Sequence, residues 1–237
     1  EFTITASVTD EAGNTDTDTG TLVIDTTAPT VAINDLTTND TTPELTGTVN
    51  DPNAIVVVTI DGNDYTATNN GTWTLADDVV ATLAEGSYPT SVSATDAAGN
   101  TASTTGTIQV DTETSVAITP GFAGGDGIVN AAEAGAGVTF TGTAEAGAIV
   151  TLSSSIDGSL STATADGSGN WSFTPGNALS DGSHNFTATA TDAAGNTSEL
   201  PDTQNGLVVT VDTTAPAVTA APNLTAASDT GVSDNDG

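Results

Sequence analysis

The 237-residue chain contains no lysine, no arginine, no cysteine and no methionine, and aromatic residues make up only 4% of it. Without cysteine, the protein has neither disulfides nor thiolate metal sites. Without lysine or arginine there is no basic patch for phosphate, which excludes nucleic acid and anionic membrane surfaces as partners. No apolar run approaches the roughly 18 residues of a transmembrane helix, so we expect no direct insertion into a membrane.

Acidic residues, by contrast, are abundant: 31 of them give a formal net charge of −31. They do not form long runs but stand singly or in pairs beside glycine, asparagine and threonine. Two carboxylates 4 Å apart repel by about 4 kcal/mol at an effective dielectric near 20, and no lysine or arginine can neutralise them. We therefore expect divalent cations to be part of the fold. A solvated, self-repelling surface is the alternative, and adaptation to high salt would explain the acidity but not its placement in turns.

A short motif recurs three times and organises the rest of the chain. It reads Thr-Asp-Ala-Ala-Gly-Asn-Thr at 95–101 and 191–197, and Thr-Asp-Glu-Ala-Gly-Asn-Thr at 9–15. Each copy is followed by a strand-like segment that ends in an aspartate and a threonine. These aspartates are Asp25, Asp111 and Asp212, and the spacings between them are 86 and 101 residues. Such a period indicates a tandem array of small domains.

The predicted organisation is two complete domains, 26–111 and 112–212, between the last part of one repeat (1–25) and the first part of another (213–237). Short runs with alternating apolar residues, separated by turn signals, predict seven strands in each complete domain. The predicted fold class is all-β, with tandem immunoglobulin-like β-sandwich domains in a linear array. The expected strands are 30–34, 44–49, 54–60, 64–68, 72–75, 88–95 and 105–110, then 114–118, 137–143, 148–153, 160–165, 170–174, 184–191 and 206–211.

The same alternation predicts the core. In the first domain we expect Val56, Val58, Ile60, Trp73, Leu75, Tyr88 and Val92 to be buried. In the second we expect Val138, Phe140, Val150, Leu152, Trp171, Phe173, Phe186, Leu207 and Val209. A hairpin of strands 2–9 and 19–24 is expected to be half buried through Phe2, Ile4, Ala6 and Val8. No long segment has a helical apolar period, and 79–83 is expected to form at most one short turn.

The recurrent loops predict calcium sites at the domain junctions. Calcium binds six to eight oxygens from carboxylates, amides, carbonyls and water. In the second loop Asp96 and Asn100 supply side-chain oxygens, and Asp111 is expected to join them at the junction. The four residues after Asp111 span at most ~14 Å, so adjacent domains nearly touch. The corresponding sets are Asp10, Asn14 and Asp25, and Asp192, Asn196 and Asp212. Asx-turns with solvent-facing acids are the alternative.

A further calcium loop is predicted in the segment 120–136, by which the second domain is longer than the first. There Asp126, Asn130 and Glu133 place oxygen donors at close intervals, although not at the spacing of a 12-residue EF-hand. The alternative is a glycine-rich surface loop. Asp236 and its neighbours are a truncated counterpart, and Asp35, Asn39 and Asp40 occupy the equivalent place in the first domain.

No set of residues indicates catalysis. His184 is the single histidine of the chain and, in a threonine-rich strand, is expected to lie on the surface. Asp77 and Asp78 abut in a turn without the aromatic platform of a glycosidase site. We therefore expect no enzymatic activity.

Several stretches together resemble a known family. Val-Asp-Thr-Thr-Ala-Pro at 211–216, the repeated loop motif, Gly-Asn-Trp-Ser-Phe at 169–173 and Asp-Gly-Ile-Val-Asn-Ala-Ala-Glu at 126–133 resemble the bacterial immunoglobulin-like repeats of giant type I-secreted adhesins, including the extender regions of RTX adhesins. The resemblance implies a secreted rod on the bacterial cell surface with calcium at and near its domain junctions. It also implies that ligand-binding and anchoring parts lie elsewhere in the parent protein.

The predicted function is therefore a structural extender that projects distant binding domains in cell adhesion or biofilm formation. Its expected partners are calcium ions and the neighbouring repeats of the same chain, in a monomeric rod. The alternative is a carbohydrate-binding module, or a self-associating module that forms filaments.

Overall fold

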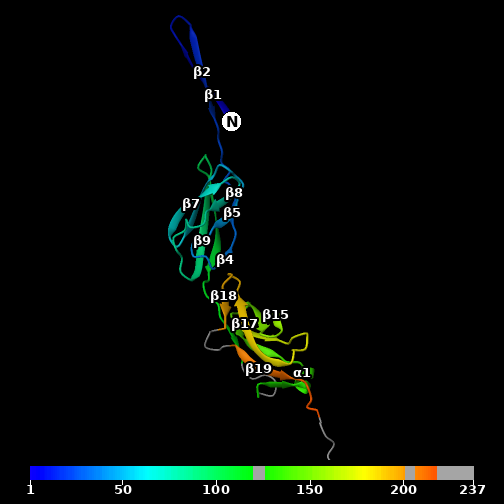
Figure 1. The fold of residues 1–237 in the computed structure, drawn as a ribbon. Helices are drawn as coiled ribbons and strands as arrows, with labels where there is room; N and C mark the ends of the chain where they lie inside the picture. The colour runs from blue at the N-terminus through cyan, green and yellow to red at the C-terminus, as the bar shows by residue number, and fades with distance from the viewer. Residues whose placement is uncertain (120–125, 201–205, 218–237) are drawn as a thin grey trace, which may run out of the picture.

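The computed structural model describes residues 1–119, 126–200 and 206–217, and within these ranges it is built from strands and one short helix (Figure 1). The chain passes through three bodies in sequence order: a β-hairpin, a body formed by β3 to β10, and a body formed by β11 to β19. Figure 1 shows them one after another in an elongated arrangement. The all-β prediction is confirmed.

The first complete body consists of eight strands in the hydrogen-bonded order β3-β5-β8-β7-β6-β9-β10-β4. β7 pairs through its first part with β6 and through Thr68 and Asn69 with β8, so it passes from one layer of the sandwich to the other. The strand bounds are β3 Val31–Ile33, β4 Leu36–Thr38, β5 Leu45–Val49, β6 Ile55–Ile60, β7 Asn63–Asn69, β8 Thr72–Leu75, β9 Gly86–Thr95 and β10 Thr101–Val110.

The second complete body has two separate sheets, in the orders β11-β13-β16 and β12-β19-β17-β14-β15, with β18 added beside β17. The bounds are β11 Val116–Ile118, β12 Ile128–Asn130, α1 Ala131–Ala136, β13 Phe140–Ala144, β14 Ile149–Ser154, β15 Gly158–Thr164, β16 Asn170–Phe173, β17 Gly182–Thr191, β18 Thr197–Glu199 and β19 Leu207–Asp212.

Each body encloses its own hydrophobic core, as the alternation of apolar residues predicts. All but three of the expected core residues are buried. The exceptions are Tyr88, Phe173 and Leu207, which pack against the cores while remaining partly exposed. Along β6 the side chains alternate between buried and outward positions, which is the period of two that a strand imposes.

A glycine–tryptophan contact repeats at the same place in both cores. Gly47 lies opposite Trp73 across β5 and β8. A methyl group on Gly47 would overlap the Trp73 ring and the Ala32 carbonyl oxygen, which accepts a 2.8 Å hydrogen bond from Trp73 Nε1. In the second body a methyl group on Gly142 would overlap Trp171 and the Ala117 carbonyl in the same way. Glycine is therefore required here by close packing.

Four short elements were not predicted. β4 and β12 add in parallel to β10 and β19, respectively, and β18 pairs with three residues of β17. Each has only three residues, too few to show an apolar period. The helix α1 follows β12 where the sequence predicts a calcium loop, and its six residues are likewise too few for a helical period.

The N-terminal hairpin pairs β1 (Phe2–Thr9) with β2 (Thr15–Leu22). The prediction that its apolar face is half buried is wrong, because Phe2 is 59% and Val8 69% exposed. No other described strand packs on that face. Counted back from the shared loop motif, Ala6 and Val8 correspond to Val92 and Ala94 of the next body, which are fully buried.

Candidate metal centre

The loop after β17 is shaped by an aspartate that accepts several hydrogen bonds. Asp192 Oδ1 accepts from the backbone N–H of Gly195 at 2.8 Å and of Asn196 at 2.9 Å. Asp192 Oδ2 accepts from Asn196 Nδ2 at 2.8 Å. Gly195 has φ +95°, a conformation that glycine adopts without steric cost. The motif thus closes a tight turn in which the Asn196 side chain has a fixed direction.

The other two copies have the same two bonds from asparagine to aspartate. Asn100 donates to Asp96 from its backbone N–H and from Nδ2, both at 2.8 Å. Asn14 donates to Asp10 in the same two ways, at 2.8 and 2.7 Å. In these two copies the asparagine side chain, donating to the carboxylate, is the largest cause of the lowered pKa of Asp10 and of Asp96. The three loops are therefore one structural unit.

Two of these loops contact the aspartate that ends the preceding repeat. Asn196 Nδ2 donates to the backbone carbonyl of Asp111 at 2.8 Å, and Asn100 Nδ2 donates to that of Asp25 at 3.2 Å. The expectation that Asp111 joins Asp96 and Asn100 of its own repeat is wrong. The ten residues of β10 separate Asp96 from Asp111 by about 33 Å. Asp25 and Asp111, the exit aspartates of their repeats, instead meet the loop of the following repeat.

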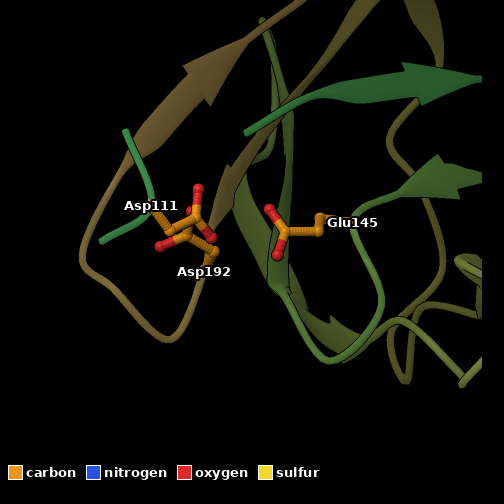
Figure 2. A group of neighbouring side chains, drawn as sticks. All are labelled: Asp111, Glu145 and Asp192. Atoms are coloured by element: carbon orange, nitrogen blue, oxygen red, sulfur yellow. The ribbon is translucent and has the colours of Figure 1, made fainter. Parts of the chain in front are cut away.

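At the second junction three carboxylates come together (Figure 2). One oxygen each from Asp111, Glu145 and Asp192 lies within 4.8 Å of the others, and all three residues are half buried. Figure 2 shows Asp111 and Asp192 side by side, with Glu145 facing them from the turn between β13 and β14. Burial, followed by the charges of Asp111 and Asp192, raises the pKa of Glu145.

Glu145 was not among the predicted site residues. Its turn reaches the junction because β14 pairs with β17, and Ile149 lies opposite Thr191, directly before the Asp192 loop. In this sandwich β14, which follows the Glu145 turn, is a neighbour of β17, which precedes the recurrent loop. A search for acids at that end of the sandwich, rather than for linear spacing, would have found Glu145.

The first junction has no matching carboxylate group, since among the described residues only Asp111, Glu145 and Asp192 meet in this way. The turn that corresponds to Glu145 contains Asn50 and Asp51. Asn50 Oδ1 accepts from the Thr30 N–H at 2.7 Å, and Asp51 Oδ1 accepts from the Asn53 N–H at 2.9 Å. These side chains stabilise their own surroundings.

The donor set at the second junction suits a hard cation. It offers oxygen ligands only, which calcium and magnesium prefer, whereas zinc and copper sites usually include nitrogen or sulfur. No lysine or arginine exists in the chain to balance the three charges. A divalent cation would remove the mutual repulsion and bind the end of one repeat to the start of the next.

The residues of the predicted loop Asp126 to Glu133 surround the start of α1. Asn130 Oδ1 accepts from the N–H groups of Ala132 and Glu133, and Glu133 Oε2 accepts from the Asn130 N–H at 3.0 Å. This reciprocal pair is a capping box. Asn130 also lies opposite Asp212 between β12 and β19, so the cap lies beside the exit aspartate. Metal binding there stays a prediction, and Asp236 lies outside the described residues.

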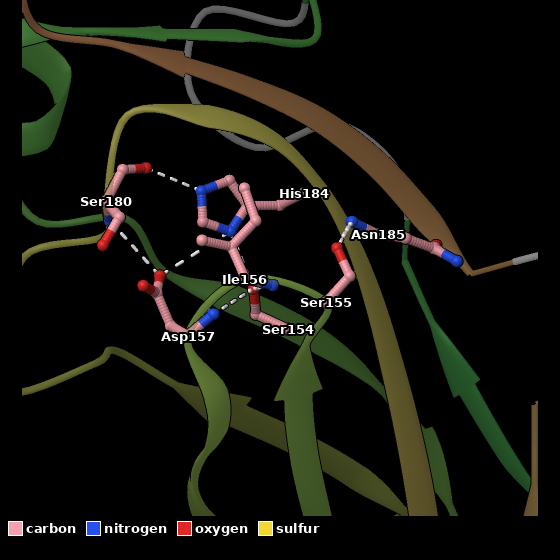
Figure 3. Close-up of polar contacts among 7 residues, drawn as sticks. All are labelled: Ser154, Ser155, Ile156, Asp157, Ser180, His184 and Asn185. Atoms are coloured by element: carbon pink, nitrogen blue, oxygen red, sulfur yellow. Dashed lines mark hydrogen bonds and ion pairs between the residues drawn. The ribbon is translucent and has the colours of Figure 1, made fainter.

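His184 is fully buried, so the expectation of a surface residue is wrong (Figure 3). Its Nε2 lies 2.7 Å from the Ser180 carbonyl oxygen and must donate to it, which leaves Nδ1 to accept from Ser154 Oγ at 2.7 Å. Asp157 lies 3.6 Å from that same Nδ1. A catalytic relay needs serine and aspartate on opposite nitrogens. His184 instead matches Tyr88, whose hydroxyl donates to the Ala84 carbonyl four residues earlier.

The fold and the junction define a chain of tandem immunoglobulin-like β-sandwiches. The sequence profile of the bacterial Ig-like domain matches residues 30–112 and 119–213, and the chain belongs to that family. No curated protein matches the chain. Within the part that the structure describes, no helix is long and apolar enough to cross a bilayer.

Several solved structures of adhesins are similar to this chain. One is the tetra-tandem repeat in the extending region of a large adhesion protein, with 26% identity over 89% of this chain and 56% of that one, and a TM-score of 0.37. Another is a Ca²⁺-stabilized adhesin that helps an Antarctic bacterium bind ice, with 29% identity over 91% and 57%, and a TM-score of 0.37. A third belongs to a 1.5-MDa bacterial ice-binding adhesin, with 26% identity over 90% and 74%, and a TM-score of 0.33. The chain thus spans little more than half the length of the first two.

Proposed function

We propose that this chain is an extender segment of a bacterial surface adhesin: a rod of Ig-like repeats, stiffened by calcium at the junctions, that projects distant binding domains in adhesion or biofilm formation. The observation that carries the proposal is the group of Asp111, Glu145 and Asp192. It joins the last residue of one repeat to two loops of the next. A cation held there would oppose bending at the junction.

The residues of this group fit calcium. Three carboxylates supply up to six oxygens, and the ion accepts further carbonyl, amide or water oxygens. Burial and the neighbouring charges raise the pKa of Glu145, so its ionised form is disfavoured without a counter-ion. Bound calcium supplies that positive charge. The protein's own residues fix the position of the ligands.

The domain boundaries and site residues of the proposal follow the repeat. Complete domains are 26–111 and 112–212, and 1–25 and 213–237 belong to adjoining repeats. At the two junctions, the exit aspartate of one repeat and the loop of the next form the site. The proposed ligand sets are Asp25, Asp96 and Asn100; Asp111, Glu145, Asp192 and Asn196; Asp10 and Asn14; and, within the second repeat, Asp212 with Asp126, Asn130 and Glu133.

The proposed role is mechanical rather than enzymatic, on the outside of a bacterial cell, as a monomeric rod. The structural role of His184 supports the absence of an acid–base centre, since both ring nitrogens are engaged within the core. The partners of the rod are calcium ions and the neighbouring repeats of its own chain.

Small-angle X-ray scattering with matched thermal melts, in millimolar calcium and then in chelator, tests the proposal. Calcium at 100 times its dissociation constant would add about 2.7 kcal/mol to stability. For a domain of this size that corresponds to a rise in melting temperature of about 10–20 °C. We expect a long, stiff particle in calcium and a shorter or broader distribution of shapes in chelator. Identical curves in both buffers would refute the role of calcium.

Self-association is a second candidate function, favoured by the apolar face of the N-terminal hairpin. Phe2, Ile4 and Val8 are each more than half exposed, and two such faces could pack on each other. Light scattering over a range of concentrations would detect this as a rising apparent mass. Glycan-array binding tests the related possibility of a carbohydrate-binding module.

A further inference from the structure

The asparagine of the recurrent loop uses both hydrogens of its side-chain amide. In Asn196 one Nδ2 hydrogen bond goes to Asp192 Oδ2 and another to the Asp111 carbonyl, each at 2.8 Å. In Asn100 the corresponding bonds go to Asp96 Oδ2 at 2.8 Å and to the Asp25 carbonyl at 3.2 Å. The first bond lies within the loop, and the second crosses to the preceding repeat.

The second junction has another bond between repeats. The backbone N–H of Asn39, directly after β4, donates to the carbonyl oxygen of Ala194 at 3.2 Å. The same loop therefore donates to the end of β10 through Asn196 and accepts from the β4 side through Ala194. Two bonds at separate points restrain rotation better than one, and both are accepted by backbone carbonyls, although Asn196 Nδ2 also lies 3.5 Å from Asp111 Oδ1.

A turn inside the second repeat shows which of these bonds is special to the junction. Asp166 to Asn170 repeats the spacing of the motif, with Asp166 Oδ1 accepting from the Asn170 N–H at 2.9 Å and Gly169 at φ +79°. Among the hydrogen bonds of the described residues, none joins Asn170 to another repeat. The turn alone therefore does not connect two repeats. The connection is made by the hydrogen bond from the asparagine side-chain amide to the carbonyl of the preceding exit aspartate.

We propose that Asn100 and Asn196 are positioning residues that hold adjacent repeats in a preset orientation without any cation, an inference that rests on the proposed function of a rod stiffened at its junctions. By fixing the Asp111 backbone, Asn196 places the Asp111 carboxylate beside those of Asp192 and Glu145. Calcium then binds to a geometry that already exists. In this role the asparagine acts as a donor to the protein.

The test uses the whole 237-residue chain in chelator. The chain has no cysteine, so cysteines at the exposed positions Thr66 and Ser161 can carry one spin label in each repeat. Pulsed electron paramagnetic resonance then measures the distribution of distances across the second junction. We expect one narrow peak for the parent chain and the loss of that peak in Asn196→Asp, since a carboxylate cannot donate to the Asp111 carbonyl.

Two further variants make the result specific. Asn196→Ala removes the donor without adding charge and should broaden the distance distribution as well. If only Asn196→Asp broadened it, charge repulsion would be the cause, and the proposal would be overturned. Asn170→Asp changes the same position of the matching internal turn and should keep the narrow peak. The fluorescence melt of Trp171 verifies that each variant is folded.

The outcomes separate this inference from the role of calcium. If the distance distribution of the parent chain is broad in chelator and narrow in calcium, Asn196 does not orient the repeats by itself. This result overturns the inference and leaves the calcium-stiffened rod intact. The parent peak can instead be narrow in chelator, be lost in Asn196→Asp and Asn196→Ala, and show no response to calcium. This result supports the positioning role of Asn196 and refutes calcium stiffening. Variants that keep the narrow peak in chelator and change only calcium affinity would identify Asn196 as a calcium ligand without any role in orienting the repeats, which also overturns the inference.

Discussion

The two junctions of this chain share one joint but differ in charge. At both, the loop asparagine donates to the carbonyl of the preceding exit aspartate, through Asn100 to Asp25 and through Asn196 to Asp111. At the second junction alone, among the described residues, a third carboxylate from Glu145 completes an acidic group. The hydrogen-bonded joint is therefore the constant feature of the repeat, and the acidic group is the variable one.

The difference comes from one turn. In the second repeat Ala144 and Ala148 enclose Glu145, whose carbonyl accepts the Ala148 N–H at 3.0 Å. In the first repeat the turn from Val49 to Ala54 is one residue longer, and the carbonyl of Asp51 accepts the Ala54 N–H at 3.2 Å. The extra residue gives the acid of that turn a different place, where its side chain accepts from Asn53. A single insertion thus separates a junction where three carboxylates meet from one where they do not.

The comparison between the junctions requires that the two sandwiches be equivalent. Substitution of the matching glycines, Gly47 and Gly142, tests this equivalence and should have the largest effect of the predictions. Gly47→Ala and Gly142→Ala each force a methyl group into a tryptophan ring and a backbone carbonyl. We expect each to destabilise its own repeat by about 3 kcal/mol or more, at the upper end of overpacking costs. Melts followed through Trp73 or Trp171 in single-tryptophan variants would measure it.

The matched control is Gly167→Ala, since a methyl group there meets nothing within 4 Å. It should leave the melting temperature nearly unchanged. If Gly47→Ala and Gly142→Ala differed widely in cost, the repeats would not be equivalent scaffolds, and the contrast between the junctions would lose its basis.

Much of the fold was accessible from the sequence because strands leave a clear local signal. The alternation along β6 and the Trp73 strand mark the core directly, and the recurrent loop gives the period of the array. The parallel additions β4 and β12 were not accessible, since three residues carry no period. Burial of the hairpin was mispredicted because alternation reports which side faces a core, not whether other strands cover that side.

The candidate site was only partly predictable. The motif correctly indicates Asp192 and Asn196 as a junction loop, yet it does not show that their partner Asp111 belongs to the repeat before. That fact depends on strand direction, and Glu145 depends on which turns share one end of the sandwich. His184 was misplaced because its hydrogen bonds go to Ser154 and Ser180, which a sequence does not bring together.

The next largest effect should be an unequal response to calcium. If Asp111, Glu145 and Asp192 bind the ion more tightly than the set at the first junction, the repeat containing Trp171 gains more from calcium. At 100 times the dissociation constant the gain is about 2.7 kcal/mol. We expect the Trp171 melt to shift by more than the Trp73 melt across a calcium titration. Equal shifts at every concentration would mean that Glu145 adds nothing to the site.

Glu145→Gln should reduce this difference, and its effect should change sign with calcium. In calcium the variant loses one charged ligand, and we expect its affinity to fall by about tenfold, equivalent to ~1.4 kcal/mol. In chelator it loses the repulsion from Asp111 and Asp192, so its melting temperature should rise. Glu113→Gln, in the exposed linker, is the matched control and should change neither. A fall in melting temperature in both buffers would mean that Glu145 matters for packing rather than charge.

The smallest predicted effect is an opposite pH dependence of the two junctions in chelator. Burial and the charges of Asp111 and Asp192 raise the pKa of Glu145, so its contribution to stability is complete below the ordinary glutamate pKa and is lost as pH rises through the raised value. Hydrogen bonds from Asn100 lower the pKa of Asp96, so its contribution is present above the ordinary aspartate pKa and is lost as pH falls through the lowered value.

Mild acidification from neutral pH should therefore first raise the Trp171 melting temperature, and stronger acidification should then lower that of the Trp73 repeat. Melts of the two single-tryptophan variants over a series of pH values would record both changes. Glu145→Gln should abolish the first change and leave the second, because it removes the only titrating group to which the rise is assigned. If the rise persisted in that variant, other carboxylates of the net charge of −31 would be its source, and the second junction would not be the place where acid is sensed.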